Sequence, residues 1–474
     1  MEHDTKTPPY LTSDVTSFAY ISARDRWPVI ITGAIDDVYR TIAQGGDAEK
    51  KDEGKKIVEE LARLKYEMQH DRKLTPIRDD GCPDVAQYNQ ELEQLGTPTW
   101  FTVPWLFCEC YLYRRISTSF TLSKHWKRYD VFARQKINTF RSSRPAVLEL
   151  AARYKNLVTQ MEADKSKTGD EHEEARKLLF VEMCEICLWG NATDLSLLTS
   201  LTYEDIQKLQ GSEARKASEK NILVNDLSAA YEVLVKAKGE GKKERRVDIV
   251  LDNAGFELYV DLILAGYLLR SGLATVVVLH PKSIPWFVSD VLPEDFLALL
   301  GALASPTSFY ETPSEDEKAQ DKTPSPVSDK EASELRFLYQ EWAKMHAEGQ
   351  LILRPNRFWT HAGSFWRLPA EGDLFDDLKS SELVVFKGDL NYRKLTGDAA
   401  WDPTTPFTEA IGPLGPGSGV NVLALRTCKA DVAVGLKPGE DERLRAMEGG
   451  GGDSGSRKWA WSGKWALVSL SRGK

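Results

Sequence analysis

The feature that most constrains the fold is a strand–helix–strand pattern between residues 247 and 280. Two short runs of mainly β-branched and aliphatic residues, VDIVLD (247–252) and ATVVVLH (274–280), are typical of strands buried on both faces. The segment between them, GFELYVDLILAGYLLRSG, predicts a helix that ends at Gly272, a residue suited to a helix C-terminus. Two strands joined in this way lie parallel in one sheet, with a right-handed crossover.

Four further strand-like runs follow in the second half of the chain. They are LILRP (351–355), ELVVFKG (382–388), VNVLALR (420–426) and KWALVSL (464–470). Strands that alternate with helical segments form a sheet with helices on both faces. We therefore expect an α/β fold: a three-layer α/β/α sandwich, Rossmann-like, with a mostly parallel sheet.

The first 180 residues have a helical pattern instead. In residues 56–71 and 146–165, apolar residues recur three and four positions apart with charges between them. The segment 105–120 is richer in aromatic residues and is typical of a helix buried on most sides. We expect a mainly helical N-terminal domain at 1–185 and an α/β/α domain at 186–474.

Three stretches are polar, charged and rich in Gly, Pro or Ser, which is a composition typical of flexible loops. They cover residues 45–55, 305–335 and 438–457. We expect all three to be mobile insertions, the one at about 305–335 disordered, and the functional residues to lie elsewhere.

Charge and composition exclude several classes of protein. The formal net charge of −9 and the pI near 5.5 argue against a general nucleic-acid binder, which needs a basic face. No apolar run reaches the roughly 18 to 20 residues of a membrane-spanning helix, and the polar N-terminus resembles no signal or transit peptide. We expect neither nucleic acid nor a membrane as partner, and a cytoplasmic protein, with the nucleus and the oligomeric state left open.

Six cysteines in 474 residues are too few for a disulfide scaffold, which indicates a reducing compartment. Cys184 and Cys187 form a CxxC pair, and Cys108 and Cys110 form a CxC pair. Neither the spacing nor the histidines of a zinc site occur nearby. We expect these cysteines to be buried as small hydrophobic side chains.

Polar residues follow the predicted strands at the edge where ligands bind in a doubly wound sheet. They are Asp252 and Asn253 with Glu257, then Asp290, then Asp389-Leu390-Asn391-Tyr392-Arg393, and finally Arg426-Thr427-Cys428-Lys429. Carboxylate and amide oxygens suit ions such as Mg²⁺ or Mn²⁺, while arginine and lysine suit phosphate. Together these residues indicate a site for a metal ion and an anion.

Each of these residues has a structural alternative when it is taken alone. Asp252 and Asn253 can cap the helix that follows, because both side chains accept hydrogen bonds from local backbone amides. Asp290 can cap the next segment, and Arg393 can be a surface charge. Their joint position at strand ends favours a ligand site.

Six strings closely resemble the DUF89 damage-control phosphatases: DNAGFELYVDL, PWFVSDV, KGDLNYRKLTGD, LRTCKADVAVGL, LWGNATDLSLL and ECYLYRRI. The segment Arg426-Thr427-Cys428-Lys429 matches the Arg-Thr-x-Lys motif of one branch, which includes the acidic residue methyltransferase 1 proteins. The resemblance extends from about residue 10 to the C-terminus, interrupted by the three insertions.

The resemblance implies an α/β/α sandwich with an added helical domain and a phosphatase for small phosphorylated metabolites, including fructose 1-phosphate and fructose 6-phosphate. It implies a divalent metal ion (Mn²⁺, Co²⁺, Ni²⁺ or Mg²⁺) held by Asp252, Asn253 and Asp290. The implied substrate-binding residues are Asp389, Leu390, Asn391, Tyr392, Arg393, Arg426 and Lys429. Asn191 in LWGN is expected to line the cleft, and Arg114 and Arg115 are expected to be structural.

In the implied mechanism, Asp252, Asn253 and Asp290 would hold the metal, which would polarise the phosphoryl group, while Arg393 and Lys429 would stabilise its equatorial oxygens. Asp252 either attacks phosphorus or orients a water molecule, and the sequence leaves both open. Glu257 either accepts a proton or supports the metal ligands. Its structural alternative is a charge favoured by the helix N-terminus.

Two other functions compete. One is an S-adenosylmethionine-dependent methyltransferase acting on protein glutamates, but LDNAGFE lacks the Gly-rich turn that such enzymes use, and GPLGPGSGV (412–420) leads into a strand. The other is a non-enzymatic metabolite sensor or interaction protein that uses the acidic 305–335 stretch. The complete set of metal ligands and cations favours the phosphatase.

Overall fold

The computed structural model describes residues 6–163, 170–190, 220–314, 317–318 and 323–474. Within this part of the chain, seven strands form one sheet in the order β1-β7-β6-β5-β2-β3-β4. The strands are β1 (Ile222–Asn225), β2 (Arg246–Val250), β3 (Val276–His280), β4 (Leu351–Leu353), β5 (Leu383–Lys387), β6 (Val422–Thr427) and β7 (Ala466–Ser471). All neighbouring strands are parallel except β6 and β7. The predicted mostly parallel sheet is confirmed.

The strand–helix–strand unit is also confirmed. β2 and β3 pair in parallel with Val247 opposite Val277, and helix α12 (Phe256–Arg270) connects them. The chain leaves this helix through Gly272, whose φ of +66° favours glycine. Every side chain of α12 from Phe256 to Leu268 is buried, so this helix is covered on all sides.

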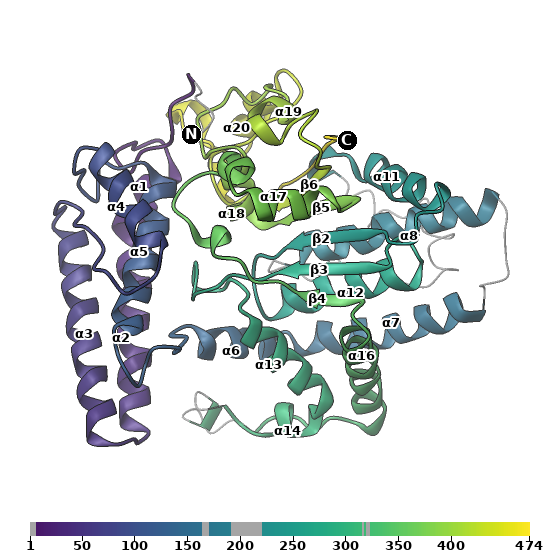
Figure 1. The fold of residues 1–474 in the computed structure, drawn as a ribbon, viewed down its shortest axis with the longest axis horizontal. Helices are drawn as coiled ribbons and strands as arrows, with labels where there is room; N and C mark the ends of the chain where they lie inside the picture. Colours follow the sequence, from purple (N-terminus) through teal and green to yellow (C-terminus); the bar gives the residue numbers. More distant parts are fainter. Residues whose placement is uncertain (1–5, 164–169, 191–219, 315–316, 319–322) are drawn as a thin grey trace.

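Side chains alternate between the two faces of the sheet, and helices cover both faces. On β5, Leu383 and Val385 belong to one hydrophobic cluster, while Val384 and Phe386 belong to the other. The first cluster includes α7 (Arg144–Ala163), α8 (Asp170–Trp189), α11 (Leu227–Gly239), α12, α13 (Pro293–Ala304) and α16 (Asp329–Ala347). The second includes α17 (Gly372–Lys379), α18 (Gly388–Leu395), α19 (Phe407–Ala410), η3 (Arg357–Thr360) and η4 (Phe365–Ala370). The three-layer α/β/α sandwich is therefore confirmed (Figure 1).

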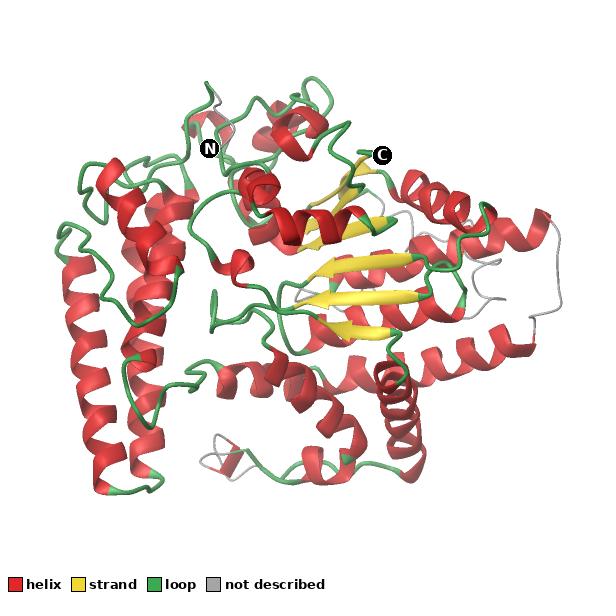
Figure 2. Ribbon diagram, in the orientation of Figure 1, coloured by secondary structure: helices red, strands yellow, loops and turns green. Residues whose placement is uncertain are grey.

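The helical N-terminal region stands beside the sheet. It comprises α1 (Phe18–Ile21), the π-helical turn η1 (Ser22–Arg26), α2 (Trp27–Ala43), α3 (Ala48–Gln69), α4 (Asp84–Gln94), α5 (Trp105–Thr121) and α6 (Ala133–Ser142). The carboxyl ends of the central strands point toward these helices (Figure 2). Buried side chains of α2, α3 and α5 join the second cluster, whereas α7 and α8 pack on the first face of the sheet. The domain boundary at residues 185 and 186 stays a prediction.

The three stretches that we expected to be mobile contain regular structure. Helix α3 begins at Ala48, where the Asp47 side chain accepts a hydrogen bond from the Lys50 amide. Ser328 and Glu331 form a capping box at the start of α16, within the stretch 305–335. The short elements α14 (Pro306–Glu311), α20 (Glu440–Ala446) and η6 (Gly452–Ser454) also lie in these stretches, whereas η5 (Gly412–Leu414) and η7 (Lys458–Trp461) lie outside them. Composition did not predict these helices, because it does not register capping side chains. The mobility of the three stretches stays a prediction.

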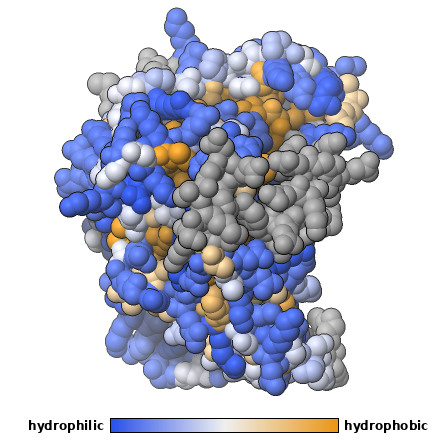
Figure 3. Space-filling model, turned by 90° about the vertical axis from the view of Figure 1, so that its right-hand side faces the viewer, coloured by the Kyte–Doolittle hydropathy of each residue, from blue (hydrophilic) through white to orange (hydrophobic). Residues whose placement is uncertain are grey.

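The cysteine pairs lie inside the protein. Cys108, Cys110, Cys184 and Cys187 are buried and form no disulfide, as predicted. The Cys187 thiol donates to Oδ1 of Asp261 at 2.8 Å. Among the described helices, none is both long and apolar enough to cross a membrane. The face seen from the right of Figure 1 is mostly hydrophilic where its side chains are described (Figure 3).

Candidate active site

A cavity of about 330 Å³ lies between the strand ends and the N-terminal helices. The strands contribute residues that follow β2, β3, β5 and β6, as expected of a ligand site at the carboxyl edge of such a sheet. The helical region contributes residues of α1, η1 and α5. The lining residues are Phe18, Arg26, Trp105, Glu109, Asp252, Asn253, Phe287, Ser289, Asp290, Asp389, Leu390, Arg393, Lys429 and Trp461.

Two backbone segments hold the three predicted metal ligands together. Asn253 and Asp290 form an antiparallel bridge, and the Val291 amide donates to the Asp252 carbonyl at 2.9 Å. The Asn253 Nδ2 donates to Oδ2 of Asp252 at 2.8 Å, while its Oδ1 accepts from the Ser289 hydroxyl at 2.5 Å. The end of β2 and the loop after β3 are therefore fixed to each other at the cavity.

Burial sets the electrostatics of the two carboxylates. Burial raises the pKa of Asp252 well above its usual range, and the neighbouring charges of Glu257 and Asp290 raise it further. Burial also raises the pKa of Asp290 to about 6, although Lys282 opposes this shift from 3.4 Å. Two adjacent buried carboxylates repel each other, so this pair gains stability from a cation.

The donor set fits a divalent metal ion. Oδ2 of Asp290 is buried and accepts no hydrogen bond within the described part of the chain, and its ion pair with Nζ of Lys282 is long, at 3.4 Å. Asp252, Asn253 and Asp290 offer carboxylate and amide oxygens to one cavity, and such oxygens are the ligands that Mg²⁺ and Mn²⁺ prefer.

The loop that carries Asp290 is held in a rare backbone conformation. Phe287 and Val288 have φ angles of +45° and +69°, a region that β-branched residues seldom adopt. Phe287 lines the cavity, and Val288 lies between Phe287 and Ser289, which also lines it. Backbone strain of this kind concentrates at functional sites.

Asp389 receives two hydrogen bonds from the Arg-Thr-x-Lys segment. Its Oδ1 accepts from Nε of Arg426 at 2.8 Å and from the Lys429 amide at 2.9 Å. The Arg426 guanidinium also donates to the carbonyls of Ala430 and Val432. Arg426 is fully buried and does not line the cavity, whereas the half-buried Lys429 does. Arg426 thus positions the segment that presents Lys429.

Arg393 lines the cavity with its charge already paired. Its guanidinium donates to both carboxylate oxygens of Asp398, at 3.1 and 2.8 Å, and to Oε2 of Glu109 at 2.8 Å. It also lies 3.7 Å above the Trp105 ring. The neighbouring carboxylates hold the pKa of Arg393 above its usual range, even though burial opposes the charge. Arg393 is therefore a rigid cation on the wall of the cavity.

Three other predicted residues lie behind the cavity. Asn391 donates to the carbonyls of Val250 and Leu251, each at 3.2 Å, and so fastens α18 to the end of β2. The Tyr392 hydroxyl accepts from the Val434 amide at 3.2 Å. Glu257 accepts from Nδ2 of Asn253 at 2.8 Å, which places it behind the metal ligands.

The structure thus separates the predicted residues into two groups and leaves one outside. Those that line the cavity are Asp252, Asn253, Asp290, Asp389, Leu390, Arg393 and Lys429. Those that support it from behind are Glu257, Asn391, Tyr392 and Arg426. Asn191 lies outside the described residues.

Sequence reasoning missed two buried lysines at the site. Lys282 donates to the Leu251 carbonyl at 2.7 Å and pairs with Asp290. Lys387 pairs with Glu257 at 3.1 Å and with Asp261 at 2.7 Å. Lys387 ends β5 and Lys282 comes two residues after β3, so the strand-end rule that identified the acids also applied to them.

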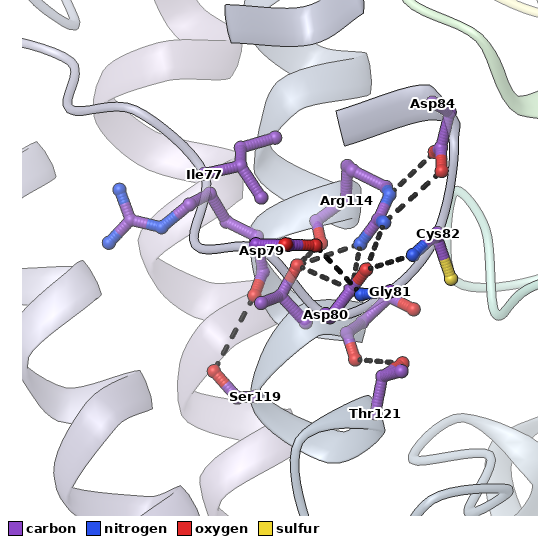
Figure 4. Close-up of polar contacts among 12 residues, drawn as sticks. Ile77, Asp79, Asp80, Gly81, Cys82, Asp84, Arg114, Ser119 and Thr121 are labelled. Carbon is purple, nitrogen blue, oxygen red and sulfur yellow. Dashed lines mark hydrogen bonds and ion pairs between the residues drawn. The ribbon is translucent and has the colours of Figure 1, made fainter. Parts of the chain in front are cut away.

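Two further charged clusters lie away from the cavity. Arg114 is buried on α5 and donates to Asp84 at 2.6 Å and to Asp80 at 2.7 Å, which makes it a structural residue (Figure 4). Glu49, Glu53 and His125 bring possible metal-ligand atoms within 4.8 Å of one another. In that cluster Glu49 already pairs with His125, and no residue of it lines the cavity.

Comparison with known proteins places the chain among relatives of similar length. It is 37% identical over 482 residues to the damage-control phosphatase ARMT1 of Xenopus laevis, covering 96% of both chains. It is 34% identical over 455 residues to the protein of that name from Homo sapiens, covering 92% of this chain and 93% of the human one. A DUF89 family protein from Pyrococcus horikoshii shares 11% identity and a TM-score of 0.37, over 82% of this chain and 89% of that chain.

A family model also matches most of the chain. The damage-control phosphatase ARMT1-like domain matches residues 22–444, a span that contains every cavity-lining residue except Phe18 and Trp461. The Arg-Thr-x-Lys segment and the three predicted metal ligands all fall within it. This chain belongs to the damage-control phosphatase ARMT1-like family.

Proposed function

We propose that this chain is a metal-dependent phosphatase that hydrolyses phosphate monoesters of small metabolites, with sugar phosphates such as fructose 1-phosphate and fructose 6-phosphate as substrates. One observation carries the proposal. Asp252 and Asp290 are buried side by side with raised pKa values, in a cavity that also presents Lys429 and Arg393. The two acids would hold a metal ion, and the nearby cation Lys429 suits a phosphate. The names of the relatives support the same activity.

The residues of the cavity have different roles in the proposed reaction. Asp252, Asn253 and Asp290 would hold the divalent ion (Mn²⁺, Co²⁺, Ni²⁺ or Mg²⁺), which supplies Lewis-acid chemistry when bound. Lys429 binds the phosphoryl oxygens and stabilises their charge. Arg393 lines the cavity as an ordered guanidinium, held in place by Asp398 and Glu109.

Supporting residues keep these groups in place. Glu257 holds Asn253 through its Nδ2, and this hydrogen bond leaves Oδ1 of Asn253 facing Ser289. Arg426 holds Asp389 and, through it, the backbone of Lys429. Sites of this kind depend on such preorganisation, because small displacements of reacting groups slow the chemistry. Asp252 is also placed to act as a nucleophile, and rapid-quench trapping of an acyl-phosphate distinguishes this role from orienting water.

The methyltransferase alternative finds no support at the corresponding turn. Gly255 is the one glycine between β2 and α12; it has a positive φ of +70°, and a Cβ atom added there would lie 3.6 Å from Cβ of Phe140. The Gly-rich segment before β6 leads into a strand, whereas a cofactor loop leads into a helix. A non-enzymatic sensor would not need the buried pair of acids. We therefore propose the enzyme, acting in the cytoplasm.

Phosphate release by Asp252→Ala tests the proposal. Purified wild-type protein with Mn²⁺ is expected to release phosphate from fructose 1-phosphate or fructose 6-phosphate, and Asp252→Ala is expected to release none while keeping its thermal unfolding transition. The matched control is Asp376→Ala, because the Asp376 side chain is 74% exposed and does not line the cavity. S-adenosylmethionine binding, measured in parallel by calorimetry, is expected to be absent. If Asp252→Ala is as active as the wild type, Asp252 does not belong to the active site and the assignment of this cavity is wrong.

A further inference from the structure

A second, larger cleft adjoins the active-site cavity. Its volume is about 990 Å³, at the upper end of the range of ligand pockets, while the active-site cavity is at the lower end. The two spaces share four lining residues, which are Arg26, Glu109, Phe287 and Ser289. A substrate whose phosphate lies at Asp252 can therefore extend its leaving group past these four residues into the larger cleft.

Arg26 stands at this junction on an unusual piece of helix. The π-helical turn Ser22–Arg26 separates α1 from α2, and π-helical turns within helices often occur at functional sites. Within the turn, Ser22 and Ala23 are buried, whereas Arg26 is exposed. The turn therefore anchors itself in the core and presents Arg26 to solvent between the two cavities.

The Arg26 guanidinium is held over a fixed aromatic surface. It lies 4.9 Å from the centre of the Phe18 ring, and Phe18 stacks on Trp461 at 5.3 Å. Asp431 fixes both aromatic residues, because it accepts from the Phe18 amide at 2.9 Å and from Nε1 of Trp461 at 2.8 Å. Stacking of this kind orders the guanidinium while leaving its N–H groups able to bind an anion.

The charge of Arg26 differs from that of Arg393 in one respect. Arg393 is paired with Glu109 and Asp398, but no described carboxylate lies within 4.0 Å of Arg26. Its one hydrogen bond within the described residues goes to the Ser22 hydroxyl at 3.3 Å. Glu109, which lines both cavities, already accepts hydrogen bonds from Arg393 and the Trp27 indole. Arg26 thus has no direct ion-pair partner among the described residues, although Asp25, Asp36 and Asp37 also line the larger cleft, and Arg26 itself lines both cavities at the junction.

We propose that Arg26 binds a second phosphate group of the substrate, on the leaving-group side. The inference rests on the proposed function, in which the phosphate to be cleaved is bound by the metal site and Lys429. A leaving group that carries only hydroxyls makes little use of the Arg26 charge, whereas a second phosphate pairs with its planar N–H groups in a bidentate manner. We therefore expect the substrates to include small sugars that carry two phosphate groups, and expect these to be preferred over the monophosphates.

The test compares fructose 1,6-bisphosphate with fructose 6-phosphate. The measured quantity is the ratio of kcat/KM for the two substrates in the wild type, Arg26→Met and Arg26→Lys. We expect Arg26→Met to lower this ratio about tenfold or more, mainly through KM, since about tenfold is the minimum expected when one charge-assisted hydrogen bond is lost. Arg26→Lys is expected to be intermediate, because lysine keeps the charge without the bidentate geometry.

Arg78→Met is the matched control. Arg78 lines neither the larger cleft nor the active-site cavity, and it is paired with Glu60 at 2.5 Å, so its loss is expected to leave the ratio unchanged. An unchanged ratio in Arg26→Met, or an equal loss for both substrates, overturns the inference, since an equal loss places Arg26 on the cleaved phosphate. If the wild type hydrolyses neither substrate, the proposed function has failed. The inference is then decided by the dissociation constants of the two sugars, measured by calorimetry in wild type and Arg26→Met.

Discussion

The backbone of Gly388 lies against the carboxylate of Asp252. A Cβ atom at position 388 would lie 1.9 Å from Oδ2 of Asp252, far inside van der Waals contact. Gly388 begins helix α18 with a φ of +79°, a conformation that glycine adopts without strain. The start of the helix that carries Asp389 and Arg393 thus packs directly on a predicted metal ligand, so the two halves of the site depend on this glycine.

Gly388→Ala is expected to abolish most of the activity. The added methyl group must displace the Asp252 carboxylate or the start of α18, and a misplacement of about 1 Å can cost about 100-fold in rate. Phosphate release and Mn²⁺ affinity, measured by calorimetry, are both expected to fall. The matched control is Gly417→Ala, because Gly417 has a similar φ of +83° and a Cβ atom added there would meet no other atom within 4 Å. If Gly388→Ala is as active as Gly417→Ala, the contact between position 388 and Asp252 does not matter for activity, which contradicts this prediction.

Metal affinity is expected to depend on pH. Burial raises the pKa of Asp290 to about 6, and a carboxylate must lose its proton before it binds a metal ion. Protons therefore compete with the metal below about pH 6, and Mn²⁺ affinity is expected to weaken by about tenfold for each pH unit below that value. Calorimetric titrations at pH 5, 6 and 7 measure this. An affinity that stays constant from pH 5 to pH 7 contradicts the assignment of Asp290 as a ligand.

Lys387→Met is expected to destabilise the fold. Its ammonium group pairs with Glu257 and Asp261 in the interior, and removing it leaves two carboxylates buried without a cation. Breaking a buried ion pair from one side costs about 3–5 kcal/mol of the free energy of unfolding. Urea denaturation measures the loss. The double variant Lys387→Met/Asp261→Asn is expected to regain part of it, and a single variant as stable as the wild type would contradict the network.

Much of the fold follows from local sequence patterns. The sequences of β2, β3, β5 and β6 are apolar enough to predict buried strands. Their parallel pairing follows from the helices that connect them. Strand β1 was not predicted, because Ile222–Asn225 is four residues long and lies at the edge of the sheet. Short edge strands carry too few apolar residues to stand out from a loop.

The position of the site could be predicted from the sequence, but the directions in which its side chains point could not. The strand-end rule located Asp252 and Asp389 beside the cavity. It could not show that Arg426 and Asn391 point inward, because the direction of a side chain depends on the neighbouring elements that receive it. Arg26 was missed because it belongs to the helical region, which joins the site only in the folded protein.

Phosphate release by chelator-stripped protein tests the central claim most directly. The protein is assayed with fructose 1-phosphate and fructose 6-phosphate, alone and after addition of Mn²⁺, Co²⁺, Ni²⁺ or Mg²⁺. Because Asp252 and Asp290 are buried together and repel each other without a cation, the stripped protein is expected to be inactive. Added metal is expected to restore release in the wild type and not in Asp252→Ala. Full activity in the stripped protein, or no release with any of the four metals, would contradict a metal-dependent phosphatase.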